Sequence, residues 1–415
     1  MILTLTQNTL LLQLDSIGTL ALALCTLLCG HSLRKKFHLL QRLCIPAVVI
    51  GGFIFMVVRL VLNIAGIVKI EMDTTFQSPA MIAFFTCIGI MTDLHRNNAV
   101  SKLLLKYWGI CAFLTVAQNV IGLGLAIVLQ ISPVYGVLAG ATTMMGGHGN
   151  GSAFGLTASN LGFPNGLETG IACATFGMLC GALIGSPFAK FLIDKYRLSS
   201  LKGKVVSKPS FADETASKDI SNQNKTMDLL KNLFIIALIM VIGSWLALLI
   251  SGFFNDIVLP EYIGGMFLGL IVRNTVCKKN KHIINYPIIN NVSNIFLNVF
   301  LSISMVSVEL WQLKDIATAL LIILLAQVFF ILLYTRFFVF RFLGHDYDSA
   351  VMCAGLIGHG LGVTPNAIAN MDSICEKYGD SKVAMFVVPA VASSLIDLVM
   401  IPTIILFFNF AVAIS

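Results

Sequence analysis

The chain has 415 residues, of which 57% are hydrophobic and only 11% charged, and its mean hydropathy is +0.89. Soluble domains carry about 25% charged residues, so this composition excludes a soluble protein and predicts a polytopic membrane protein. The net charge of +7 does not indicate a nucleic-acid partner, because the basic residues lie in short segments between apolar stretches. The ten cysteines lack metal-ligand spacing and predict reduced, apolar side chains.

Apolar segments recur along the chain at lengths that suit a bilayer, since a membrane span needs about 20 mostly apolar residues. The sequence predicts ten spans, at residues 10–30, 44–66, 80–92, 107–130, 169–193, 229–253, 259–273, 288–308, 316–343 and 384–412. The third and the seventh are short, and we expect them to be broken or tilted. The first 30 residues contain no Lys or Arg, so we expect no cleavable signal peptide.

One extended polar segment, residues 197–227, divides the chain into two parts. Its low hydrophobicity and mixed charge predict a flexible, solvated connection, with a regulatory role as the alternative. We therefore predict an N-terminal half of five spans over residues 1–196, a linker over 197–227 and a C-terminal half of five spans over 228–415.

The basic residues predict how the chain is oriented in the membrane. They gather at residues 34–42, at 96–106, in the linker, at 273–281 and at 336–341, which follow every second span. Cytoplasmic loops carry an excess of Lys and Arg, so these segments belong on the cytoplasmic side. Both termini are then predicted to lie outside the cytoplasm, with the linker inside.

The two halves contain similar motifs in the same order. The matched positions are Pro46 and Pro260, Gly51-Gly52 and Gly264-Gly265, Arg59 and Arg273, Gln118 and Gln327, and Pro187 and Pro402. Because five is an odd number, the second half must cross the membrane in the opposite sense to the first. The sequence therefore predicts an all-α fold of two inverted five-helix repeats, an architecture typical of secondary transporters.

Two glycine-rich stretches, residues 146–152 and 358–370, occupy matching places in the halves. Glycine and proline disfavour helices, and non-helical backbone in a membrane must be buried in protein or face a water-filled cavity. We predict non-helical, re-entrant loops near residues 134–155 and 349–370, which enter from opposite sides and approach each other at their tips. Tight glycine packing between helices is the alternative.

The two loops present groups that can hold a small anion or zwitterion. Free backbone N–H groups at helix N-termini suit a carboxylate, and neutral side chains add further donors and acceptors. The predicted substrate-binding residues are Gly147, His148, Gly149, Asn150, Gly151, Ser152, His359, Gly360, Gly362, Thr364, Pro365 and Asn366. His148 has a second interpretation, in which it merely satisfies a neighbouring backbone group.

Asp397 lies deep within the last apolar segment. An intramembrane carboxylate is costly and usually functional, so we predict a Na⁺ ligand or proton carrier, with pairing to a buried Arg as the structural alternative. Asn370 and Ser394 complete the predicted Na⁺ site. Gln118 and Gln327 are predicted to support the loops from behind.

Other glycines predict packing rather than binding. Gly177, Gly181 and Gly185 recur every four residues in the fifth span, and Gly265 and Gly269 in the seventh. Small residues at this spacing let a second helix approach closely.

Enzyme signatures are missing from the sequence. Residues 146–152 are not followed by the Gly-Lys-Ser/Thr of a phosphate loop, and Ser152 is not in a Gly-x-Ser-x-Gly turn. We therefore expect no enzymatic activity and no cofactor. Paired glycine loops also occur in channels, so a channel or facilitator is the alternative to a carrier, although charge rings and repeated carbonyl filters are missing.

The motifs around the glycine stretches resemble those of the bacterial sodium/glutamate symporter family. The likeness rests on Gly146-Gly147-His148-Gly149-x-Gly151, on residues 172–177 and 360–371, and on Val387-Val388-Pro389 before Asp397. It runs from about the second span to the end, without the linker. It implies an inner-membrane carrier, surrounded by lipid, that takes up L-glutamate with Na⁺ as the coupling ion. It also implies a homodimer and an elevator-like movement.

Three positions depart from the pattern of this family. Asn150 stands where the family often has Thr, Leu356 replaces a His, and His359 replaces a Phe. If these positions contact the substrate, another small carboxylate or amino acid becomes the alternative to glutamate.

Overall fold

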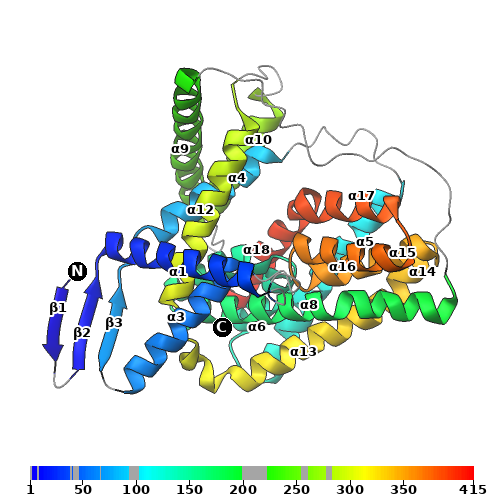
Figure 1. Cartoon of the computed structure of the whole chain (residues 1–415), viewed down its shortest axis with the longest axis horizontal. Helices are drawn as coiled ribbons and strands as arrows, with labels where there is room; N and C mark the ends of the chain where they lie inside the picture. The colour runs from blue at the N-terminus through cyan, green and yellow to red at the C-terminus, as the bar shows by residue number, and fades with distance from the viewer. Residues whose placement is uncertain are drawn as a thin grey trace. The chain divides into compact units, whose positions relative to one another are not determined.

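The computed structural model describes residues 2–6, 9–37, 40, 46–65, 67–92, 102–198, 222–253, 260–276 and 283–415 (Figure 1). The chain forms two compact units. The first comprises residues 1–27, 54–99 and 207–307, and the second comprises 28–53, 100–206 and 308–415. Each unit therefore draws segments from both halves of the sequence. Of the predicted linker, residues 199–221 lie outside the described part of the chain.

The described residues are predominantly helical, and seven of their helical segments are long and apolar enough to cross a membrane. These segments are Ser16–Lys36, Ala47–Ile64, Lys102–Val128, Gly166–Tyr196, Thr226–Gly252, Tyr286–Ser307 and Ala317–Leu343. Two shorter apolar helices, α4 (Gln77–Met91) and α18 (Asp397–Ala413), join them. The prediction of a polytopic, helical membrane protein is confirmed.

The first and last predicted spans differ from the helices observed. The span expected at residues 10–30 begins too early, because Thr9–Leu14 is a strand and helix α1 (Ser16–Lys36) starts after it. The span expected at 384–412 is divided into α17 (Lys382–Ala390), a π-helical turn η4 (Val391–Leu395) and α18. Pro389 lacks the N–H that would continue the helical bonding there, which accounts for the irregular turn.

A three-stranded sheet adds to the helical fold that the sequence predicts. Strands β1 (Ile2–Thr6) and β2 (Thr9–Leu14) pair antiparallel, and β2 pairs in parallel with β3 (Val68–Met72). In this register Leu12 lies opposite Leu3 on one side and Ile70 on the other. A short apolar run does not distinguish a strand from the start of a buried helix by periodicity, so the sequence reading missed the sheet.

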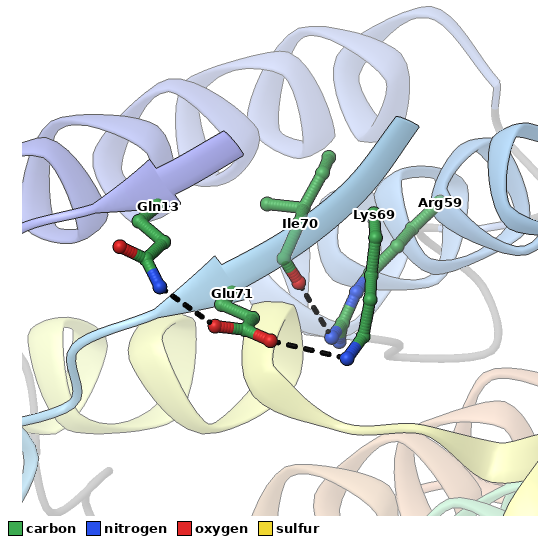
Figure 2. Close-up of polar contacts among 5 residues, drawn as sticks. All are labelled: Gln13, Arg59, Lys69, Ile70 and Glu71. Atoms are coloured by element: carbon green, nitrogen blue, oxygen red, sulfur yellow. Dashed lines mark hydrogen bonds and ion pairs between the residues drawn. The ribbon is translucent and has the colours of Figure 1, made fainter. Parts of the chain in front are cut away.

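Arg59, on α3 (Ala47–Ile64), fastens this sheet within the first unit. Its buried guanidinium donates through Nη2 to the carbonyl oxygen of Ile70 (2.9 Å) and through Nη1 to that of Ser307 (3.2 Å). Figure 2 shows Arg59 reaching the backbone of β3 while Gln13 and Lys69 reach the Glu71 carboxylate. The hydrogen bonds from Gln13 and Lys69 both lower the pKa of the exposed Glu71, and the bond from Gln13 has the larger effect.

Close backbone contacts hold the helices of the first unit together. On α10 (Glu261–Asn274), a Cβ at Gly269 would lie 2.9 Å from the carbonyl oxygen of Thr86 on α4. A Cβ at Gly243, on α9 (Asn222–Phe253), would lie 2.5 Å from the Cα of Gly265. The prediction that Gly265 and Gly269 serve packing is confirmed. A buried hydrogen bond from Gln77 Nε2 to Ser304 Oγ (2.9 Å) joins α4 to α12 (Tyr286–Ser307).

We predict that Arg59→Met lowers the free energy of unfolding by about 2 kcal/mol, because buried carbonyls lose their donors while the aliphatic packing is kept. The measurement is the melting temperature of the detergent-solubilised protein. Lys69→Met is the control, because its bond to Glu71 is exposed and should leave the melting temperature unchanged. Equal melting temperatures for the two variants would contradict the role given to Arg59.

Candidate substrate and cation site

The second unit contains two helical hairpins that include the glycine-rich stretches. The first hairpin consists of α6 (Pro133–Val137), the π-helical turn η1 (Leu138–Thr142) and α7 (Gly147–Asn160). The second consists of α15 (Tyr347–Gly360) and α16 (Thr364–Tyr378). The two arms of the second hairpin pack closely: a Cβ at Gly358 would lie 2.6 Å from the Cα of Ala367.

The prediction that the glycine-rich stretches are non-helical is wrong for most of their length. Residues 147–152 form the first turns of α7, and residues 358–360 form the end of α15. The helical backbone is interrupted at residues 145–146 and 361–363, and it is also kinked at Gly140, whose ψ of −145° is not helical. Helical bonding satisfies the backbone groups locally, which an apolar environment favours. The glycines within the helices do not break them; they allow two backbones to approach closely.

Each hairpin is closed at its base by a tyrosine. Tyr135, on the first arm of one hairpin, donates its hydroxyl to the carbonyl oxygen of Pro164. Tyr347, on the first arm of the other, donates to the carbonyl oxygen of Gly379. In both cases the acceptor follows the second arm, so the two hairpins are tied in the same way.

The breaks of the two hairpins lie against each other, as the sequence predicts for the loop tips. Gly147 has a φ of +62°, a conformation that side chains disfavour. A Cβ at Gly147 would lie 2.6 Å from Cγ1 of Val363 and 3.7 Å from the carbonyl oxygen of Gly362. Glycine is therefore required at position 147 both by its backbone conformation and by its neighbour.

The predicted substrate-binding residues occupy these breaks and the turns beside them. Six of them form the first turns of α7, two end α15, Gly362 lies in the second break, and three begin α16. Several of their buried polar atoms have no hydrogen-bond partner among the described residues: Asn150 Oδ1, Ser152 Oγ and Asn366 Oδ1. An unpaired buried polar atom costs about 1–3 kcal/mol, so a ligand or water that bonds to these atoms would stabilise them.

His148 is buried and directed toward α8 (Gly166–Tyr196). Its Nε2 lies 3.0 Å from Oγ1 of Thr175, and that hydroxyl donates to the carbonyl oxygen of Ile171 (2.8 Å). Because the hydroxyl proton is used, the hydrogen-bond network assigns the proton between the two side chains to Nε2 of His148. The partner of Nε2 is therefore a side-chain hydroxyl and not the neighbouring backbone group of the second interpretation.

His359 is directed toward α5 (Lys102–Val128) and not toward the break between the hairpins. Its Nε2 lies 2.9 Å from the hydroxyl of Tyr107 and 3.8 Å from Sγ of Cys111, both on α5. Leu356, the other departure on this hairpin, is fully buried.

Two adjacent amide side chains on α5 each hold one hairpin. Gln118 Nε2 donates to the carbonyl oxygen of Gly360 (2.7 Å), at the tip of the second hairpin. Asn119 Oδ1 accepts from the backbone N–H of Ala141 (3.1 Å), in the first hairpin. Gln327 supports this arrangement from behind, because its Nε2 donates to the carbonyl oxygen of Gln118 (2.8 Å). The sequence reading singled out the two glutamines and missed Asn119, although it directly follows one of them.

Helix α8 packs closely against the second hairpin at a row of glycines. A Cβ at Gly177 would lie 2.5 Å from the carbonyl oxygen of Leu361, and one at Gly181 would lie 3.0 Å from that of Gly358. The prediction that these glycines permit close packing is confirmed. Asn370 Nδ2 donates to the carbonyl oxygen of Gly181 (2.8 Å), and Ser186 Oγ donates to Asn370 Oδ1 (3.1 Å). Both amide atoms of Asn370 are thus already bonded to α8.

Asp397 follows the π-helical turn η4 and begins α18. Thr364 Oγ1 donates to the carbonyl oxygen of Ala392 (2.9 Å), and Trp108 Nε1 donates to that of Leu395 (2.8 Å). The turn is therefore bonded both to the second hairpin and to α5. No arginine in the described part of the chain forms an ion pair with Asp397, and the side chain of Ser394 lies outside that part.

Comparisons with known proteins agree with the motifs on these hairpins. The family model described as sodium/glutamate symporter matches residues 12–380. The sodium/glutamate symporter of Escherichia coli (strain K12) is 33% identical over 388 residues, which cover 93% of this chain and 96% of that protein. The sodium/glutamate symporter of Haemophilus influenzae is 35% identical over 385 residues, covering 92% and 94%. This chain belongs to the sodium/glutamate symporter family.

Proposed function

We propose that this protein carries L-glutamate across the inner membrane in symport with Na⁺. Its family, the names of its relatives and its seven candidate membrane spans support this function. The observation that carries it in the structure is the meeting of two hairpin tips with unpaired polar atoms of Asn150, Ser152 and Asn366 buried beside them.

The substrate is held by the helix ends that meet at the breaks. Helices α7 and α16 begin there with the predicted residues from Gly147 and from Thr364 onward. Their N-terminal N–H groups and positive dipole ends favour carboxylates. Neutral amide and hydroxyl groups then bind the remaining polar groups of the amino acid without a buried countercharge, which limits the desolvation cost.

Glutamate is favoured over another substrate by the positions of the departures from the family pattern. His359 is bonded to Tyr107, and Leu356 is buried within the second hairpin. Asn150 is the departure that retains an unpaired oxygen beside the break. Another small carboxylate or amino acid is the alternative, and it would depend on Asn150.

The coupling ion is assigned to the region of Asp397, with Ser394 and Asn370 as the further predicted ligands. Asp397 supplies the negative charge, and irregular helical turns in transporters commonly supply carbonyl oxygens to Na⁺. The hydrogen bond from Thr364 to Ala392 in the adjacent turn η4 provides a direct connection between the cation region and the substrate hairpin.

The transport cycle follows from an inverted repeat of two five-span halves with re-entrant hairpins. The matching tyrosine bonds at the hairpin bases and the matching glutamines support this repeat. Both termini then lie outside the cytoplasm and the linker lies inside. We propose that the protein forms a homodimer in the lipid bilayer and moves the substrate by an elevator-like movement.

The test is uptake of radiolabelled L-glutamate into proteoliposomes with and without an inward Na⁺ gradient. We expect accumulation above equilibrium only with the gradient. Na⁺-driven uptake of a different carboxylate would change the substrate, and downhill flux that ignores Na⁺ would favour a facilitator or channel.

We predict that Gly147→Ala abolishes uptake while membrane insertion is kept, because the new Cβ combines a strained positive φ with a clash against Val363. Gly162→Ala is the matched control. Gly162 also has a positive φ (+92°), but its Cβ would meet nothing within 4 Å, so only the backbone strain of about 1–3 kcal/mol remains. Wild-type uptake by Gly147→Ala would contradict a role of Gly147 in transport and would leave it a packing residue.

We predict that Asp397→Asn raises the Na⁺ concentration needed for half-maximal uptake by about tenfold or more, because the charge that binds the cation is removed. Uptake is measured against Na⁺ at fixed glutamate, and the melting temperature without Na⁺ should stay close to that of the wild type. An unchanged Na⁺ dependence would remove Asp397 from the cation site.

A further inference from the structure

A cavity of about 560 Å³ lies between α8 and α16. Its walls include Ser186 and Lys190 from α8 and Asn366, Asn370 and Lys377 from α16. Binding cavities for small ligands have volumes of about 300–1,000 Å³, so this one can admit an amino acid with its hydration water. Nothing in the substrate site described above requires it.

The inner end of the cavity reaches the second hairpin. Asn366, fully buried, donates through Nδ2 to the carbonyl oxygen of Met178 (2.9 Å), while its Oδ1 has no partner among the described residues. Asn370 and Ser186 also line the cavity and are bonded to each other. The cavity therefore ends at a residue that the proposed substrate site also uses.

Two lysines line the outer end of the cavity. Lys190 and Lys377 are exposed there, one on each helix, and they are the charged residues of the cavity wall. The nearby Asp194 accepts a hydrogen bond from the hydroxyl of Tyr378 (3.0 Å), which joins the two helices at the mouth. Asp372 and Glu376, also on α16, do not line the cavity.

We propose that this cavity is the cytoplasmic access path of the anionic substrate, in which Lys190 and Lys377 attract its carboxylates and Asn366 receives it. The inference rests on the proposed transport function. A cleft lined by charges of one sign raises the local concentration and the association rate of a ligand of opposite sign. The cytoplasmic assignment follows from α8, which leads directly into the basic linker.

The test compares the two faces of the membrane. The KM for glutamate is measured in right-side-out vesicles, which present the outer face, and in inside-out vesicles, which present the cytoplasmic face. Lys190→Gln and Lys377→Gln should each raise the cytoplasmic KM by about threefold, and the double variant by about tenfold, while the outer KM is unchanged. Added KCl should raise the cytoplasmic KM of the wild type and have less effect on the double variant.

Lys195→Gln is the matched control. Lys195 lies on the same helix, where its Nζ is 5.6 Å from the ring centroid of Phe191 and 5.7 Å from that of Tyr196, and it does not line the cavity. Its substitution should leave both KM values unchanged. An equal effect of Lys195→Gln would show a general surface-charge effect and overturn the proposal.

Two further outcomes would also overturn the proposal. One is a failure to see a change confined to the cytoplasmic face, either because the cytoplasmic KM of the double variant is unchanged or because the KM changes equally on both faces. The other is an effect that needs anionic lipid and disappears in phosphatidylcholine proteoliposomes, which would assign the lysines to lipid headgroups. Failure of the transport function itself is distinguishable, because the wild type would then show no Na⁺-driven uptake at either face.

Discussion

The second unit depends on two neighbouring amide side chains. Gln118 and Asn119 are fully buried on α5, and each bonds to the backbone of a different hairpin. Consecutive residues on a helix point about 100° apart, so one helix can hold two segments on adjacent faces. Because these bonds reach backbone groups, they fix the position of the hairpins independently of the hairpins' own side chains.

The second hairpin is also held from the opposite direction by α8. Backbone contacts at Gly177 and Gly181 bring the two elements together, and Asn366 and Asn370 donate to carbonyl oxygens of α8. All of these groups are neutral. Burying neutral, paired amides costs far less than burying charges, so the hairpin can be held firmly within an apolar unit. The unpaired oxygen of Asn366 stands out against this bonded background.

Much of the candidate site could be read from residue types and their order. The glycine-rich stretches, the supporting glutamine Gln118 and the packing glycines of α8 all lie where the sequence places them. The orientation of the side chains could not be read in this way. His148 and His359 have similar neighbours in the sequence, yet one is bonded to Thr175 on α8 and the other to Tyr107 on α5. Those partners are distant in the sequence, and a pattern within one segment carries no information about them.

By itself the sequence determined that the chain is a helical membrane protein, where most of its apolar helices run, and which two segments contain its glycine-rich turns. Composition and hydrophobic length decide these features, because the bilayer imposes them on each segment separately. The tertiary structure decided that the glycine-rich turns are short breaks between helices, that strands β1 to β3 pair, and that Asn119 holds a hairpin. It also decided that a cavity with two lysines opens between α8 and α16. These features arise from contacts between distant segments, whose partners the local sequence does not specify.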